Sequence, residues 1–177
     1  MKFAYADPPY LGCGKLYADR HADALDADDP EWRRALITRL SDEFPDGWAM
    51  SLSSPSLQTL LPMCPPDVRV ASWVKPFAIF KPNVGRAYAW EPVIVRGGRK
   101  IERDQATVRD WVSANITLKR GLTGAKPRDF CRWMFEFLNM QPGDEFIDLF
   151  PGSGAVMAAY QEWANENVPQ LTFSLGS

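Results

Sequence analysis

The sequence predicts an α/β fold with a mostly parallel sheet and helices on both faces. Short apolar runs of strand length alternate with amphipathic runs of helix length along the 177 residues. In addition, a strand that ends at Phe150 leads through a glycine-rich turn directly into a helix. Strands that alternate with helices pair in parallel, because each helix carries the chain back across the sheet. With 46% hydrophobic residues, the chain can bury one sizeable core, and we expect a single domain over residues 1–177.

The first 97 residues predict four strands and two helices. The expected strands are residues 2–6, 48–52, 68–74 and 87–95. Pro30 suits the first turn of a helix, and apolar residues at helical spacing follow it as far as Phe44. A short second helix is expected from Ser54. Residues 11–29 are rich in Gly, Asp and Ala without periodicity, which predicts a long mobile loop after the first strand.

The last third of the chain predicts a further set of strands and helices. Pro127 opens a helix that ends before Pro142-Gly143. A buried strand is expected at 145–150, a helix at 155–167 and a last strand at 171–175. The apolar signal between these two parts of the chain is weak.

Two motifs carry candidate chemistry. Asp7-Pro8-Pro9-Tyr10 follows an apolar strand, and its prolines fix the backbone, so that a carboxylate and a carbonyl can accept both N–H bonds of an amine. Asp148-Leu149-Phe150-Pro151-Gly152-Ser153-Gly154 combines a strand end with a turn whose glycines let backbone N–H groups approach a ligand. A dinucleotide site is disfavoured, because Met157 stands where the third glycine of that motif would be.

These motifs, in this order, resemble the permuted beta group of DNA amino-methyltransferases, in which the amine motif precedes the cofactor loop. Ala125-Lys126-Pro127 matches the segment that opens the part between them. The resemblance implies a Rossmann-like S-adenosylmethionine-dependent methyltransferase fold that is circularly permuted and lacks a large target-recognition domain. It implies a catalytic half at 1–95, a basic target-recognition loop at 96–125 and a cofactor-binding half at 126–177.

The resemblance also implies a role for each site residue. The implied catalytic residues are Asp7, Pro8, Pro9 and Tyr10. Asp7 and the Pro8 carbonyl would hold the target amine in line with the methyl donor, and Tyr10 would stack on the base. The residues implied to bind S-adenosylmethionine are Lys126, Pro127, Asp148, Phe150, Pro151, Gly152, Ser153 and Gly154. Further candidates to line a base pocket are Trp73, Lys75, Trp90 and Glu91.

Charge is distributed unevenly along the chain. The net charge is −2, yet residues 96–128 hold nine basic and three acidic side chains, which gives this stretch +6. A locally basic surface on an acidic body suits a protein that binds phosphates in one place, although charge clusters are more often solvated loops. The expected nucleic-acid-binding residues are Arg96, Arg99, Lys100, Lys119 and Arg120.

We therefore expect DNA as the partner and methylation of a flipped base, with adenine N6 favoured. The alternatives are cytosine N4, RNA or a free nucleotide as the substrate, and a catalytically silent nucleic-acid-binding relative. The three scattered cysteines and the single histidine, His21, predict no disulfide framework and no metal site. We expect a cytoplasmic protein without a membrane span, and a dimer is one alternative. The strand at 171–175 departs from the family pattern, because it lacks an acidic residue for the cofactor ribose. Three alternatives follow: Ser174 substitutes, a solvent contact substitutes, or the cofactor binds weakly.

Overall fold

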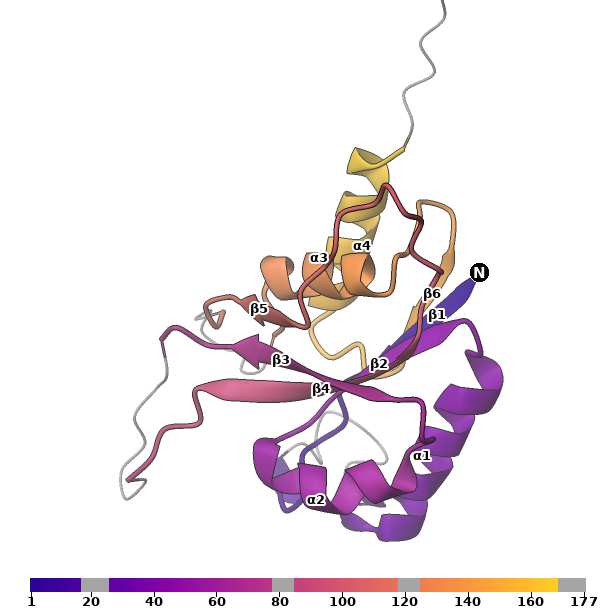
Figure 1. Cartoon of the computed structure of the whole chain (residues 1–177). Helices are drawn as coiled ribbons and strands as arrows, with labels where there is room; N and C mark the ends of the chain where they lie inside the picture. Colours follow the sequence, from indigo (N-terminus) through magenta and orange to yellow (C-terminus); the bar gives the residue numbers. More distant parts are fainter. Residues whose placement is uncertain (17–25, 78–84, 118–124, 169–177) are drawn as a thin grey trace, which may run out of the picture.

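A computed structural model describes residues 1–16, 26–77, 85–117 and 125–168 (Figure 1). Its core is a six-stranded sheet in the order β5-β3-β4-β2-β1-β6. The strands are β1 (Lys2–Ala6), β2 (Gly47–Ser51), β3 (Arg69–Val74), β4 (Trp90–Gly97), β5 (Trp111–Ser113) and β6 (Glu145–Asp148). The predicted α/β class is confirmed.

The sheet is parallel except at β4. Strand β1 lies between β2 and β6 and runs parallel to both, and β3 runs parallel to β5. Strand β4 lies antiparallel between β2 and β3. The carboxyl ends of the five parallel strands therefore share one edge of the sheet, which we call the carboxyl edge. Because β4 runs the other way, it begins at this edge with Trp90 and ends at the opposite, amino edge with Gly97.

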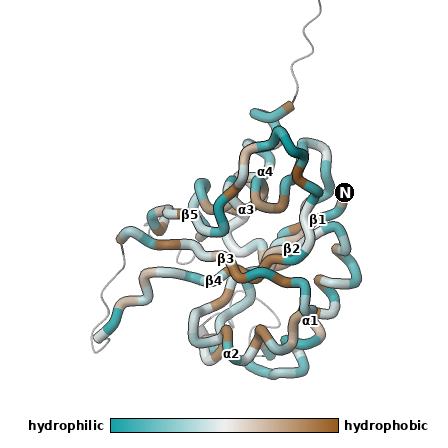
Figure 2. Tube along the Cα trace, in the orientation of Figure 1, coloured by the Kyte–Doolittle hydropathy of each residue, from teal (hydrophilic) through white to brown (hydrophobic). Residues whose placement is uncertain are grey.

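Helices cover both faces of the sheet (Figure 1). Helices α1 (Pro30–Glu43) and α2 (Leu57–Leu60) lie on one face, and α3 (Arg128–Phe137) and α4 (Ala155–Glu166) lie on the other. Successive side chains along each strand point to opposite faces, so the sheet contributes residues to two separate hydrophobic cores. Figure 2 shows hydrophobic stretches along the central strands between these helix layers. Burial of apolar surface on both faces is what holds the edges of the sheet in place.

Capping by a side chain marks the start of helix α1. At the start of α1, Asp29 accepts a hydrogen bond from the backbone N–H of Glu31 at 2.9 Å, and Pro30 occupies the first turn. Helix α3 begins directly after Pro127. A short 3-10 turn, η3 (Ser54–Ser56), leads into α2, and a second, η4 (Leu61–Met63), follows it. The predicted positions of α1 and α4 are confirmed within one residue, whereas α2 begins three residues after the predicted Ser54 and α3 ends at Phe137, earlier than the predicted stop at Pro142.

Two regions differ from the sequence-based expectation. Strand β5 lies in a stretch whose apolar signal is weak, and it pairs with β3 through Ser72 and Trp111. Three residues are too few for a periodic signal, so only its pairing with β3 reveals the strand. The expected loop at 11–29 contains two 3-10 turns, η1 (Gly14–Leu16) and η2 (Asp26–Asp28). The strand expected at 171–175 lies outside the described residues.

Candidate active site

The structure brings the two sequence motifs together at the carboxyl edge. Asp7 directly follows β1, and Asp148 is the last residue of β6. The register pairs Tyr5 with Asp148, and the backbone N–H of Leu149 donates to the Tyr5 carbonyl at 2.9 Å. The two motifs, which come from opposite ends of the chain, therefore begin at the ends of neighbouring strands, as the parallel arrangement predicts.

A chain of buried ion pairs joins Asp7 to the neighbouring strands. The Lys126 ammonium lies 2.9 Å from Asp7 Oδ1 and 2.8 Å from Glu91 Oε1. The other oxygen of Glu91 lies 2.9 Å from the Lys75 ammonium. The side chains of Lys126 and Glu91 are only 4% and 5% exposed, against 22% for Asp7. The alternating signs balance the charges, which makes their burial tolerable.

Burial and pairing set the protonation of these groups. Burial opposes ionisation of Glu91, but the ammonium groups of Lys126 and Lys75 outweigh it and lower the pKa of Glu91 to about 2. Burial works against the charged form of Lys126, yet Asp7 and Glu91 raise its pKa well above the usual value. Burial raises the pKa of Asp7, while the Lys126 ammonium opposes that shift. Lys126 is thus the counter-charge that favours the ionised form of Asp7.

Asp148 is the least satisfied carboxylate of the site. Its Oδ1 accepts a hydrogen bond from the Phe150 N–H at 3.1 Å, whereas Oδ2 is buried and has no partner among the described residues. Burial raises the pKa of Asp148 to about 6, and the nearby Asp7 carboxylate adds to the shift. A buried carboxylate oxygen without a donor is costly, so this atom is suited to a cation or an N–H donor from a ligand.

The loop after Asp148 adopts the conformation that its glycines allow. Gly152 has φ 46° and Gly154 has φ 75°, a region that other residues rarely adopt. Gly154 is also the N-cap of α4, so the loop leads directly to the positive end of that helix. A methyl group built on Gly154 would meet no atom within 4 Å, which leaves the space beside this backbone open.

Arg33 is a site residue that the motifs did not reveal. It is 2% exposed, because it lies on the core-facing side of α1. Its guanidinium donates to the backbone carbonyls of Pro9 and, at 2.6 Å, of Ala27. Arg33 of helix α1 thereby fixes the backbone of the Asp7–Tyr10 motif. The signal in the sequence is an arginine among the apolar positions of a helix, beside Leu36.

Aromatic rings lie around the ion chain. The Lys126 Nζ is 5.5 Å from the centre of the Trp73 ring and 6.0 Å from that of Tyr10. Burial raises the pKa of Tyr10 well above its usual value, so this hydroxyl stays neutral. Phe150 packs edge-on against Trp32 of α1, with their ring centres 6.1 Å apart. Of the predicted pocket residues, Trp73 is buried, whereas Trp90 is 41% exposed.

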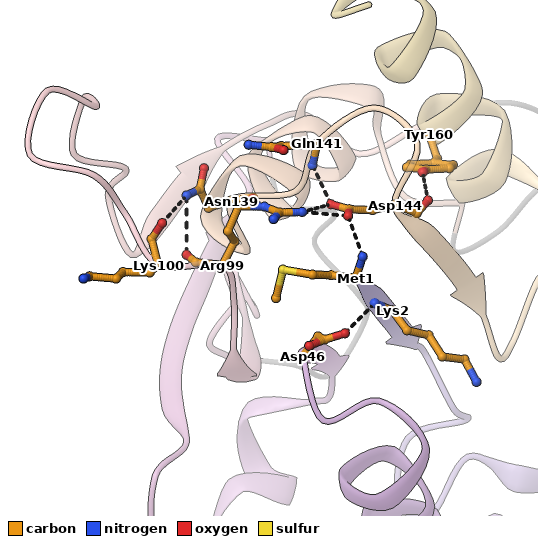
Figure 3. Close-up of polar contacts among 9 residues, drawn as sticks. All are labelled: Met1, Lys2, Asp46, Arg99, Lys100, Asn139, Gln141, Asp144 and Tyr160. Atoms are coloured by element: carbon orange, nitrogen blue, oxygen red, sulfur yellow. Dashed lines mark hydrogen bonds and ion pairs between the residues drawn. The ribbon is translucent and has the colours of Figure 1, made fainter.

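The predicted nucleic-acid-binding residues lie elsewhere in the structure. Arg96 lies near the end of β4 and Arg99 shortly after it, so both lie at the amino edge, away from Asp7. Arg96 binds both oxygens of Asp67 at 2.9 and 3.0 Å. Figure 3 shows that Arg99 binds both oxygens of Asp144, at 2.7 and 2.8 Å. The Lys100 carbonyl accepts a hydrogen bond from Asn139 in the same region. The two remaining candidates, Lys119 and Arg120, and His21 lie outside the described residues.

The described part of the chain offers neither a metal cluster nor a membrane helix. It holds no group of three or more His, Cys, Asp or Glu side chains placed to bind a metal ion. None of its helices has the length and apolarity needed to cross a membrane.

The arrangement of strands and helices matches solved structures. M1.HpyAVI in its complex with SAM superposes with a TM-score of 0.56 at 15% identity, over 92% of this chain and 78% of that protein. TTHA0409 from Thermus thermophilus, provisionally described as a DNA modification methylase and complexed with S-adenosyl-L-methionine, gives a TM-score of 0.53 at 16% identity, over 93% and 78%. The chain therefore shares the fold of these two proteins, each of which was crystallised with S-adenosylmethionine. No protein-family model matches the sequence, and no curated protein matches it.

Proposed function

We propose that this protein is an S-adenosylmethionine-dependent DNA methyltransferase that modifies an exocyclic amino group, with adenine N6 as the favoured acceptor. The observation that carries the proposal is the position of Asp7 and Asp148 at neighbouring strand ends of one sheet edge. One aspartate is held beside a buried ammonium, and the other keeps a buried oxygen without a donor among the described residues. A methyl acceptor and a cationic cofactor need these two environments side by side.

The residues around Asp148 fit the cofactor. The Oδ2 of Asp148, which has no partner in the part of the chain that the structure describes, suits the ammonium of a methionine group, and the open space beside Gly154 lets a ligand approach the backbone. S-adenosylmethionine would supply a methyl group on a sulfonium, and loss of that methyl leaves a neutral thioether. Phe150 and the loop from Pro151 to Gly154 would hold the rest of the cofactor. The two structural neighbours named above were crystallised with S-adenosylmethionine.

Asp7 would orient the amine. An exocyclic nitrogen is a weak nucleophile because its lone pair is delocalised into the ring, and hydrogen bonds from both its N–H groups localise that lone pair. A carboxylate has about four lone-pair sites, so Asp7 can accept from the amine while it also accepts from Lys126. The Pro8 carbonyl would take the second N–H. As the new N–C bond forms, nitrogen becomes positively charged and its proton can leave to Asp7.

The neighbours of Asp7 hold it ready for that role. Lys126 favours the carboxylate over the acid, and Glu91 fixes the position of Lys126. Arg33 holds the Pro9 carbonyl, so the two prolines cannot turn away from the site. Tyr10 would offer its ring to the extracted base, since a paired base cannot reach a buried methyl donor. Cytosine N4 presents the same donor geometry and is the second candidate acceptor.

The decisive experiment measures methyl transfer and cofactor binding separately. The protein is incubated with labelled S-adenosylmethionine and mixed DNA or RNA, and the digested nucleosides are analysed for methylated adenine and cytosine. We expect N6-methyladenine from DNA, and we expect Asp7→Ala to lower the rate at least ~100-fold, the scale seen when one preorganised transition-state contact is lost. The cofactor dissociation constant of Asp7→Ala, measured by calorimetry, should change by less than about twofold, because its binding group is Asp148. Unchanged turnover in Asp7→Ala would contradict the role given to this residue.

A further inference from the structure

Exposed aromatic side chains gather on one projection of the molecule. We call residues 75–90, which connect β3 to β4, the β3–β4 arm; the structure describes 75–77 and 85–90 of it (Figure 1). Four aromatic side chains are exposed in the described part of the chain, and three of them lie on this arm. They are Phe77 at 58% exposure, Tyr88 at 60% and Trp90 at 41%. Leaving three large rings in water is unfavourable, which marks an interaction surface.

The arm begins and ends at the carboxyl edge, where the proposed active site lies. The Lys75 N–H donates to the Ala89 carbonyl at 2.8 Å, so the two sides of the arm are joined at its base. At that base, Lys75 binds Glu91, which binds Lys126, which binds Asp7. A chain of three successive ion pairs thus connects the base of the arm to Asp7, the residue proposed to hold the target amine.

The charge of the arm selects its partner. Its described residues include Lys75, which is paired with Glu91, and Arg86 but no carboxylate, although the whole chain carries a net charge of −2. In the described part, residues 85–90 are all exposed, and they include Arg86, Tyr88 and Trp90. Cations beside exposed rings complement a single strand of nucleic acid, whose phosphates are anionic and whose bases stack on aromatic faces.

We propose that the β3–β4 arm binds the DNA strand next to the extracted nucleotide. Phe77, Tyr88 and Trp90 stack on bases, and Arg86 contacts a phosphate. The inference rests on the proposed function for the identity of the strand as DNA and for the extracted nucleotide beside it. It also relocates DNA binding from the residues around Arg96 and Arg99, which are paired with carboxylates at the amino edge.

The test measures binding of the full-length chain to labelled single-stranded DNA of mixed sequence by fluorescence anisotropy. Each of Tyr88→Ala and Trp90→Ala should weaken binding at least about fivefold, the scale expected when one stacked base is lost. Tyr88→Phe should retain the wild-type affinity, because stacking needs the ring and not the hydroxyl. The matched control is Trp111→Ala, since Trp111 is 43% exposed but lies on β5, and it should bind as the wild type does. Arg86→Gln should lower the salt dependence of binding by roughly the contribution of one phosphate contact.

Melting temperatures close to that of the wild type confirm that the variants fold. Wild-type affinity in the arm variants overturns the inference, as does an equal loss in Trp111→Ala. A lower dimer content in the arm variants with unchanged DNA binding also overturns it, because the arm would then bind a second copy. At least tenfold tighter binding of RNA than of DNA overturns the assignment to DNA.

The two proposals fail in different ways. If DNA binding depends on the arm but no methylated nucleoside forms, the arm is supported and the methyltransferase proposal fails. If DNA is methylated and the arm variants keep the wild-type affinity, the methyltransferase proposal stands and the arm inference fails.

Discussion

Asp144 directly precedes the four-residue strand β6 and Asp148 is its last residue, yet the surroundings of the two aspartates differ in kind. At the amino edge, the Asp144 side chain is 6% exposed and binds the Arg99 guanidinium, the Met1 amino group and the Gln141 N–H (Figure 3). At the carboxyl edge, one Asp148 oxygen has no partner among the described residues. The sheet therefore has one edge that is saturated with internal contacts and one that is left ready for ligands, as expected for parallel sheets that bind ligands beyond the carboxyl ends of their strands.

The pKa values of the two aspartates express the same difference. Burial raises the pKa of Asp144, but the hydrogen bonds from Arg99 and the amino terminus outweigh it and lower the pKa below the usual value. At Asp148, burial dominates and the pKa rises to about 6. Folding therefore favours the ionised form of Asp144 and opposes that of Asp148.

The largest expected effect is loss of stability in Asp144→Asn. This change removes the charge that three donors share, and it should lower the free energy of unfolding by about 2–4 kcal/mol, since breaking a buried ion pair leaves its partner uncompensated. Urea denaturation measures the effect. Cofactor affinity of the folded variant should stay within about twofold, because the change lies at the opposite edge. A stability equal to that of the wild type would show that the amino edge does not hold the sheet.

Asp148→Asn should produce the reverse pattern. Its amide oxygen can still accept from the Phe150 N–H, and the variant loses a buried charge that lacks a donor among the described residues, so stability at pH 7 should be unchanged or higher. Affinity for S-adenosylmethionine should fall at least about tenfold, because the ammonium of the cofactor loses its counter-charge. Calorimetry and urea denaturation on the same sample make the contrast with Asp144→Asn direct. Wild-type affinity in Asp148→Asn would remove Asp148 from the cofactor site.

The two aspartates should also respond to acid with opposite signs. The raised pKa of Asp148 means that its contribution to the stability of the ligand-free protein is present below its usual pKa of 3.8 and is lost as the pH rises through about 6. The lowered pKa of Asp144 means that its contribution is present above 3.8 and is lost as the pH falls through the folded value.

Cofactor binding provides the measurement. If Asp148 binds the cofactor ammonium as proposed, binding needs its ionised form. The affinity for S-adenosylmethionine should then be roughly tenfold weaker at pH 5, one unit below the pKa of about 6, than at pH 7. Calorimetry across this range tests the expectation, and Asp148→Asn is the control whose weak binding should not vary over it. An affinity independent of pH in the wild type would contradict the pKa assigned to Asp148.

The sequence predicted the meeting of the two motifs at the carboxyl edge better than the groups that support them. Asp7 follows one apolar run of strand length and Asp148 lies at the end of another, and the rule that parallel strands share an edge is enough to bring them together. The ion chain through Glu91 and Lys75 depends on the register between β3 and β4, which local patterns do not encode. Arg33 was missed for a similar reason, since its partners are backbone carbonyls far from it in sequence or in another element.

The basic residues show a further limit of local patterns. A charge count along residues 96–128 finds a positive stretch but does not say at which edge of the sheet it lies. The reversal of direction in β4 carries Arg96 and Arg99 to the amino edge, although Trp90 of the same strand begins at the carboxyl edge. The position of a charge in the fold thus depends on strand direction, which the predicted parallel sheet does not specify for each strand.

The smallest expected effect is therefore that of the double change Arg96→Gln with Lys100→Gln. The Arg96 ion pair with Asp67 is exposed, and such pairs contribute little to stability, so the free energy of unfolding should match that of the wild type within error. If the β3–β4 arm is the DNA surface, the dissociation constant for single-stranded DNA should change less than about twofold at a salt concentration of about 0.15 M, where charges far from the strand are screened. The same anisotropy assay that tests Tyr88→Ala measures it. A loss larger than that of Tyr88→Ala would return DNA binding to the amino edge and reverse the contrast between the two edges.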